Sequence, residues 1–175
     1  MSVLPTLTVR PAKAPDAPRV AAIYIASWNA GFVGLLPPRS LDAGQIARWE
    51  RDICRPAPHR WWVVEAERSI VGFTGIRPCG DADAASLGEL DTIAVHPEAW
   101  RQGAGRALMA VALAAFRQDR YRAAVLWTRR GYERAASFYG STGWRPDGAV
   151  RRNGTEIRFR HALQPEQERA SGEPP

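Results

Sequence analysis

Hydrophobic and polar residues recur along the chain with two different periods, and each period predicts one type of element. Apolar residues at helical spacing predict a helix over Arg19 to Trp28. A second helix is expected over Leu41 to Asp52, with Ser40 as its capping residue. The stretch between them, Asn29 to Pro38, contains two glycines and two prolines and should interrupt the helical pattern. The early part of the chain is therefore expected to form a helix–loop–helix segment.

Short apolar runs rich in β-branched and aromatic residues predict the strands. Trp61 to Ala66 and Ile70 to Ile76 are joined by the short turn Glu67-Arg68-Ser69, so they predict an antiparallel hairpin. Further strands are expected over Thr6 to Arg10, Leu87 to Val95, Ala123 to Thr128 and Thr155 to His161. Further helices are expected over Gly105 to about Arg117 and over Glu133 to Ser141.

The length of 175 residues suits a single domain with a sizeable core. We expect this domain to span residues 1–163, and the charged, Gly- and Pro-bearing stretch 164–175 to be a disordered tail. No run approaches the length of a membrane span, and the N-terminus lacks the pattern of a secretory signal. The two cysteines, Cys54 and Cys79, are far apart, so neither a disulfide framework nor a zinc site is expected. We therefore expect a cytoplasmic protein with no membrane partner.

The net charge of +6 and the pI of about 10.1 raise the question of nucleic-acid binding, because basic surfaces attract phosphate backbones. The basic residues are mostly arginines spread from Arg10 to Arg169, interleaved with Asp and Glu, and they form no long run. A polyanionic cofactor would account for some of them. We therefore expect no nucleic-acid partner.

The chain is organised around the stretch from Leu87 to Arg106, which reads as a strand, a glycine-containing loop and the start of a helix. Gly103 and Gly105 leave the backbone uncovered where the helix begins, so N–H groups can point at an anion with the helix dipole behind them. This predicts a phosphate-binding loop, and a merely flexible helix start is the alternative. A dinucleotide loop is disfavoured because its third glycine position is Leu108, and the Gly-Lys-Ser/Thr ending of a Walker-type loop is absent.

Two motifs in order carry a resemblance to a known family. The first is Ile93-Ala94-Val95, His96-Pro97 and the loop ending Gly103-Ala104-Gly105-Arg106-Ala107-Leu108. The second is Ala135-Ala136-Ser137-Phe138-Tyr139 followed by Gly143-Trp144. Together they resemble the GCN5-related N-acetyltransferase (GNAT) family, and Val9-Arg10-Pro11 and the segment Trp28 to Pro37 are similar to it as well. The chain departs from the family pattern at Trp100, where Gln or Arg is common, at Arg101, where Gly is usual, and at Tyr132, where Asn is frequent.

The resemblance implies an α/β fold: a mixed, mostly antiparallel twisted sheet that splays in the middle, with helices on both faces. It also implies an acetyl-CoA-dependent N-acetyltransferase that acts on a primary amine by direct transfer in a ternary complex, with no metal. Backbone groups would bind the pantetheine and pyrophosphate of acetyl-CoA at Ile93, Ala94, Val95, Arg101, Gln102, Gly103, Ala104, Gly105 and Arg106. In the family the early helix–loop–helix segment covers the acceptor, so Trp28 and Phe32, with Trp49, are candidate acceptor residues; the alternative is that these aromatics are core.

Acetyl transfer to an amine requires a base for the ammonium proton and an acid for the departing thiolate. The resemblance places the acid at Tyr139, whose phenol can donate to a thiolate of similar basicity; packing beside Phe138 is the alternative. It places the base at Glu89, with Asp91 or a water chain as rivals and a structural carboxylate as the alternative. A bulge, which the family has in this strand, would change which side of the strand later residues occupy. The three histidines, His59, His96 and His161, are expected to be structural or solvated rather than metal ligands.

Two other functional classes remain open at this level. One is a non-catalytic acyl-CoA-binding module or sensor, in which Tyr139 and Glu89 would be dispensable. The other is a basic nucleic-acid-binding protein. The acceptor amine is not readable from the residues, although the positive net charge disfavours highly cationic acceptors. A monomer and a homodimer are both left open.

Overall fold

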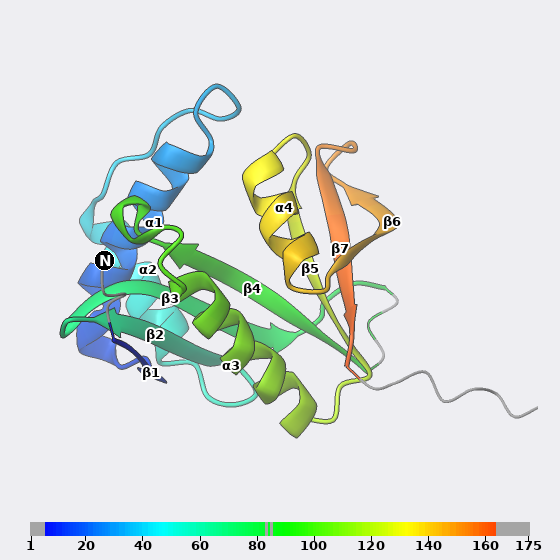
Figure 1. Ribbon diagram of the computed structural model, residues 1–175, viewed down its shortest axis with the longest axis horizontal. Coiled ribbons are helices and arrows are strands. Elements are labelled where there is room, and N and C mark those ends of the chain that lie inside the picture. The colour runs from blue at the N-terminus through cyan, green and yellow to red at the C-terminus, as the bar shows by residue number, and fades with distance from the viewer. Residues whose placement is uncertain (1–5, 83, 85, 164–175) are drawn as a thin grey trace, which may run out of the picture.

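The computed structural model describes residues 6–82, 84 and 86–163, and these form a layered α/β structure around one sheet (Figure 1). The sheet has seven strands in the order β1-β2-β3-β4-β5-β7-β6. Their bounds are β1 Leu7–Pro11, β2 Arg60–Ala66, β3 Ser69–Pro78, β4 Leu87–Val95, β5 Ala123–Arg129, β6 Arg145–Arg151 and β7 Glu156–Ala162. The predicted tail, 164–175, lies outside the described residues, so the division into one domain and a tail stays a prediction.

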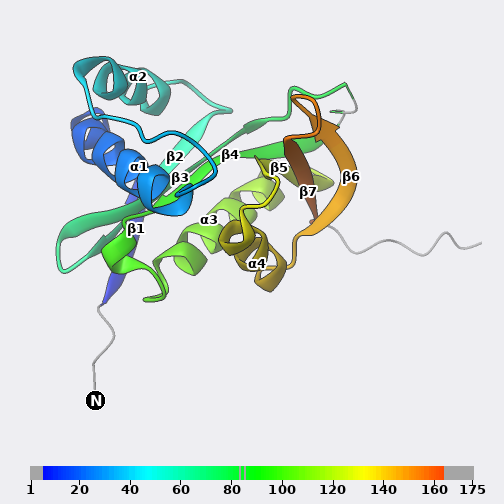
Figure 2. The ribbon, with the colours of Figure 1, turned by 90° about the horizontal axis from the view of Figure 1, so that it is seen from above.

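Helices cover both faces of the sheet (Figure 2). One face carries α1 (Ala17–Gly31) and α2 (Ala43–Ile53), and the other carries α3 (Ala104–Gln118) and α4 (Glu133–Ser141). Two 3-10 turns, η1 (Ala14–Asp16) and η2 (Pro97–Ala99), precede α1 and the loop before α3. Every neighbouring strand pair is antiparallel except β4 with β5. The predicted mixed, mostly antiparallel α/β fold is confirmed.

Each face of the sheet has its own hydrophobic core. On the α3 side, β4 and β5 contribute Leu90 and Leu126, which pack with Met109 and Phe116 of α3 and with Trp144. On the α1 side, the packed residues include Val20, Ile23, Trp49, Trp61 and Phe73. Trp49, on the buried face of α2, is therefore a core residue, which supports the packing alternative for that aromatic.

The sheet opens between β4 and β5, as the resemblance implies. Their parallel pairing covers only Leu87 to Glu89 against Ala123 to Val125, so the rest of β4 has no partner on that side among the described residues. The pairing of β4 with β3 also shifts, because Thr92 pairs with Gly75 whereas Leu90 pairs with Ile76. Asp91 is therefore an extra residue in β4, which is a β-bulge. The splay and the bulge occur at the same part of the same strand.

The structure corrects two predictions about the early helices. Helix α1 continues through residues 29–31 and ends at Gly31, so the expected break begins later than Asn29. Helix α2 is capped by Asp42 rather than Ser40: Asp42 has an extended backbone, and its side chain accepts a hydrogen bond from the Gln45 N–H at 2.8 Å. Because Leu41 precedes this cap, it is 45% exposed and does not belong to the apolar stripe of the helix.

Strand β6 was not predicted from the sequence. It contains Pro146 and Gly148, its first four residues are all exposed, and only Ala149 and Arg151 are half-buried, so it has no apolar pattern. Among the described residues it pairs only with β7, at the edge of the sheet, and its register shifts between Pro146 and Val150. An edge strand tolerates proline because one side of its backbone needs no partner, and this is why its sequence signal is weak.

Candidate functional site

A cavity of about 800 Å³ lies where the end of β4, the loop before α3 and helix α4 meet. It is lined by Ile93, Ala94, Val95, Trp100, Arg101, Gln102, Gly103, Gly105, Arg106, Tyr132, Arg134, Ala135, Ser137, Phe138, Tyr139 and Ser141. Eight of the nine predicted cofactor residues are therefore brought together here. The exception is Ala104, which is 1% exposed and packs with Val64 and Leu108. Only its backbone N–H remains available to a ligand.

The loop at one end of the cavity is shaped for an anion. Gly103 has φ of 91°, a left-handed conformation that favours glycine, and its carbonyl accepts the N–H of Ala107 at 3.0 Å. The N–H groups of the three residues between them, Ala104 to Arg106, precede the hydrogen-bonded ladder of α3 and have no partner within the helix. At Gly105 an added Cβ would lie 3.3 Å from the Phe138 ring. A side chain there would therefore crowd helix α4 as well as the loop.

Trp100 ties this loop to the neighbouring elements. Its indole Nε1 donates to the Val95 carbonyl at 2.8 Å, and the guanidinium of Arg134 in α4 lies 4.0 Å from the centre of its ring. Both side chains line the cavity. In the sequence, Trp100 stands out only as a departure from the family pattern, and nothing in the local sequence marks Arg134 as a site residue. Their contact is visible only once α4 is placed across the loop.

Tyr139 projects from α4 into the wall of the cavity. Its ring centre lies 5.7 Å from that of Phe138 and 5.7 Å from that of Phe159, so the ring is held by packing on two sides. The hydroxyl has no hydrogen-bond partner among residues 6–82, 84 and 86–163. Burial, with a smaller contribution from Tyr132, raises the pKa of the Tyr139 hydroxyl above its ordinary value. The group therefore stays protonated at neutral pH and can act as a hydrogen-bond or proton donor.

Tyr132 connects the cavity to the segment after α1. It lines the cavity at the start of α4, and its ring centre lies 4.5 Å from that of Phe32. A Cβ on Gly31 would lie 2.1 Å from the Tyr132 hydroxyl oxygen, so glycine is required there for this contact. Phe32 in turn lies 4.6 Å from Trp28, ring centre to ring centre. The two predicted acceptor residues are therefore not among the lining residues, but they reach the cavity through Tyr132.

Glu89 lies on the other face of the sheet from this cavity. A Cβ on Gly88 would meet Phe116 of α3, and Leu90 packs with Met109, so the alternation of side chains directs Glu89 towards the α1 and α2 side. It is 4% exposed, and Arg77 donates to its Oε1 at 2.9 Å. The structure thus places Glu89 and Tyr139 on opposite faces, at the strand where the sheet splays.

Arg77 joins the two candidate bases. Its Nη2 contacts Glu89, and its Nε lies 3.0 Å from Asp91 Oδ1. Burial alone would lower the pKa of Arg77, but the two carboxylates raise it overall, so the guanidinium stays charged. Asp91 shares the face of Glu89, because Arg77 reaches both. Sequence reasoning did not single out Arg77, since the contact depends on the pairing of β3 with β4.

Within the described ranges, no group of three or more His, Cys, Asp or Glu side chains is placed to hold a metal ion. No helix in that part of the chain is both long enough and apolar enough to span a bilayer. Both cysteines are free thiols, Cys79 buried and Cys54 exposed.

Comparison with known sequences identifies one family. A model described as the acetyltransferase (GNAT) family matches residues 20–144. The uncharacterized N-acetyltransferase YuaI of Bacillus subtilis is 30% identical over 105 residues, which are 59% of this chain and 61% of that protein. The chain thus matches less than two thirds of the length of that relative. The probable N-acetyltransferase Rv2775 of Mycobacterium tuberculosis is 26% identical over 147 residues, 81% of this chain and 82% of that protein.

Comparison with solved structures supports the fold. The PaiA N-acetyltransferase of Thermoplasma acidophilum, in complex with coenzyme A, superposes with a TM-score of 0.72 at 16% identity, covering 90% of this chain and 99% of that one. YncA of Salmonella typhimurium, described as a putative acetyltransferase with its cofactor acetyl-CoA, superposes with a TM-score of 0.71 at 16% identity, covering 91% and 95%. At this identity the likeness concerns the fold alone.

Proposed function

Because the chain belongs to the GNAT family of acetyltransferases, we propose that it transfers the acetyl group of acetyl-CoA directly to a primary amine within a ternary complex. The observation that carries the proposal is the 800 Å³ cavity, which joins a helix start suited to an anion to a tyrosine hydroxyl that has no partner among the described residues. A phosphate-bearing thioester needs both features. The chain contributes binding, orientation and proton transfer, while the thioester is already an activated acyl donor.

The loop before α3 is the proposed pyrophosphate site. The N–H groups of Ala104 to Arg106 and the positive end of the helix dipole favour negative charge there. The arginines that line the same cavity, Arg101, Arg106 and Arg134, add cationic side chains suited to phosphate. The edge of β4 at Ile93 to Val95 has no strand partner on the β5 side among the described residues, so it offers strand-like hydrogen bonds to the amides of the pantetheine arm.

Tyr139 is the proposed general acid. As the amine nitrogen bonds to the thioester carbon and the carbon–sulfur bond breaks, the departing thiolate takes the hydroxyl proton. The raised pKa keeps that proton in place before the reaction. The hydroxyl has no protein acceptor among the described residues, so it is available to the sulfur.

The proposed base for the incoming ammonium is Glu89, with Asp91 as the rival, acting directly or through water. A free alkylammonium has a pKa near ~10 and must lose a proton before it can attack. Both carboxylates lie at the splay of β4, where the pairing with β5 ends at Glu89 among the described residues. The amine would approach from the α1 and α2 side, with Trp28 and Phe32 in the segment that covers it.

A thermal shift assay tests cofactor binding. Acetyl-CoA and CoA should stabilise the protein, whereas NAD and ATP should not, and a ligand at ~100 times its dissociation constant adds about 2.7 kcal/mol. A panel of amines with acetyl-CoA, followed by thiol release, then tests transfer. A shift with NAD and none with CoA would remove the proposal. Stabilisation by CoA without thiol release from any amine would leave a binding protein only.

A further inference from the structure

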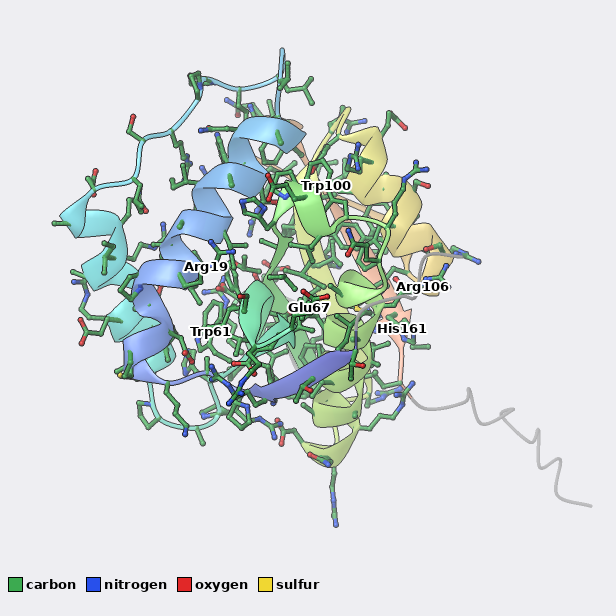
Figure 3. All side chains as sticks on the ribbon, turned by 60° about the vertical axis from the view of Figure 1, so that its left-hand side comes forward. Arg19, Trp61, Glu67, Trp100, Arg106 and His161 are labelled. Carbon is green, nitrogen blue, oxygen red and sulfur yellow. The ribbon has the colours of Figure 1, made fainter. Side chains whose placement is uncertain are left out.

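A second cavity, of about 320 Å³, lies on the face of the sheet opposite the 800 Å³ cavity proposed to bind acetyl-CoA, which we call the cofactor cavity. Its walls come from α2 and the loop after it, from Trp61 of β2, from Arg77 of β3 and from Asp91 of β4. Figure 3 shows Trp61 on the side covered by α1 and α2, whereas Arg106 lies at the start of α3 on the other side. Its volume is near the lower end of ligand pockets, about 300–1,000 Å³, which suits a small molecule.

The lining of this cavity carries excess positive charge. Arg48, Arg51 and Arg55 line it from α2 and the residues that follow, while Asp52 is the acidic group beside them. Asp52 is shared, because Arg48 Nε lies 3.6 Å and Arg55 Nε 3.7 Å from its two oxygens. Arg51 has no acidic partner among the described residues. One carboxylate therefore faces three guanidinium groups on this wall.

The opposite wall of this cavity contains Arg77 and Asp91, and Asp91 is one of the two carboxylates proposed as the base. Asp91 is the bulge residue of β4, and Arg77 holds it in one group with Glu89. Ile93, two residues further along the same strand, lines the cofactor cavity. Two residues of strand span only about 7 Å, so Asp91 in the lining of this cavity and Ile93 in the lining of the cofactor cavity lie close together along β4, on opposite faces of the sheet. Arg77 is itself neutralised by its two carboxylates, which leaves the α2 arginines as the cations for a ligand.

We propose that this cavity binds the acceptor by an anionic group, so that the acceptor is a small amino acid-like molecule with a primary amine and a carboxylate or phosphonate. This inference rests on the proposed acetyl transfer and names its substrate class. The acidic group pairs with Arg51 and Arg55, because guanidinium groups bind such oxygens in bidentate fashion. The amine then lies towards Asp91 and Glu89, where its proton is removed. Trp61 supplies an apolar wall between the two ends.

The test compares amines that differ only in the anionic group. Glycine, β-alanine, 4-aminobutanoate and glutamate are each assayed beside the amide of the same carbon skeleton, with aminomethylphosphonate beside methylamine, by thiol release from acetyl-CoA. At least one acid should be used with kcat/KM roughly tenfold or more above its neutral partner, as expected for hydrogen bonds to a charged group. In the Arg51→Gln, Arg55→Gln double variant this preference should fall by on the order of tenfold through KM, with kcat retained.

Arg120→Gln is the matched control, since Arg120 is exposed beyond the end of α3, outside both cavities. It should leave the acid preference unchanged, and circular dichroism checks that the double variant is folded. Three outcomes would each overturn the inference while leaving acetyl-CoA binding intact. The first is that amides are used as well as their acids, and the second is that no acid is turned over by a protein that acetyl-CoA stabilises. The third is an unchanged acid preference in the folded double variant. Failure of acetyl-CoA to stabilise the wild-type protein would instead remove the proposed function, and this inference with it.

Discussion

Replacing Tyr139 with phenylalanine removes one hydroxyl and keeps the ring. The ring contacts with Phe138 and Phe159, both at 5.7 Å between centres, are retained in the variant. Because the hydroxyl has no protein partner among the described residues, its loss leaves no buried donor or acceptor unpaired. The free energy of unfolding should therefore change by less than about 1 kcal/mol.

The effect on turnover should be far larger than the effect on stability. Loss of one general acid costs on the order of 10² to 10⁴ in rate, which is roughly 2.7 to 5.5 kcal/mol of transition-state stabilisation. The affinity for CoA should stay close to that of the wild type, because the contact matters mainly as the sulfur departs. The raised pKa also means that the wild-type protein should keep the proposed acid protonated as the pH rises from neutral towards the ordinary tyrosine range near ~10.

The assay needs one amine from the panel, initial rates of thiol release, and CoA binding by thermal shift. Tyr121→Phe is the matched control: burial also raises the pKa of Tyr121, but it packs against Phe116 and does not line the cofactor cavity. Its turnover should match that of the wild type. Normal turnover in Tyr139→Phe would refute the assigned role, and a parallel loss of CoA affinity would make Tyr139 a packing residue instead.

Three further outcomes are expected. Gly105→Glu should abolish the thermal shift with CoA while circular dichroism shows a folded chain, because a carboxylate would occupy the proposed phosphate site and crowd Phe138. Retained CoA binding would mean that the proposed phosphate loop is misplaced. Gly31→Ala should displace Tyr132 and lower the free energy of unfolding in urea by about 1–3 kcal/mol. Adding Tyr132→Ala to the same chain should relieve part of this loss, and additive changes in the free energy of unfolding would contradict the contact. The pKa of Asp16 is lowered chiefly by hydrogen bonds from Arg10. The pair therefore stabilises the fold at pH values above the unfolded pKa of Asp, and this contribution is lost as the pH falls through the lower folded pKa. Asp16→Asn should weaken the decrease in the free energy of unfolding measured from about pH 7 to about pH 3, and an unchanged decrease would show that the pair contributes nothing.

Patterns within short stretches of sequence were sufficient to predict most helices and strands and the glycine loop at one end of the cofactor cavity. The bounds of β4 and α4 match the prediction, because an apolar run and a helical stripe are properties of a few consecutive residues. The glycine loop could likewise be predicted, since a left-handed φ at Gly103 is a requirement of that residue's own backbone. Tyr139 was located by its place in a motif, and the structure puts it in the cavity wall.

Contacts between distant segments could not be predicted, because they depend on which strands pair and which faces meet. The alternation of side chains on β4 and the position of α4 place Glu89 and Tyr139 on opposite faces of a splayed sheet, an arrangement that neither local sequence determines. Tyr132 meets Gly31 and Phe32 across a hundred residues of chain, and Arg77 reaches Asp91 only through the bulged pairing of β3 with β4. The arginines of α2 have an ordinary surface pattern in the sequence. They become the wall of a cavity because the packing of α2 on the sheet brings their charges to the same place as Asp91, and no local preference of the backbone encodes that distance.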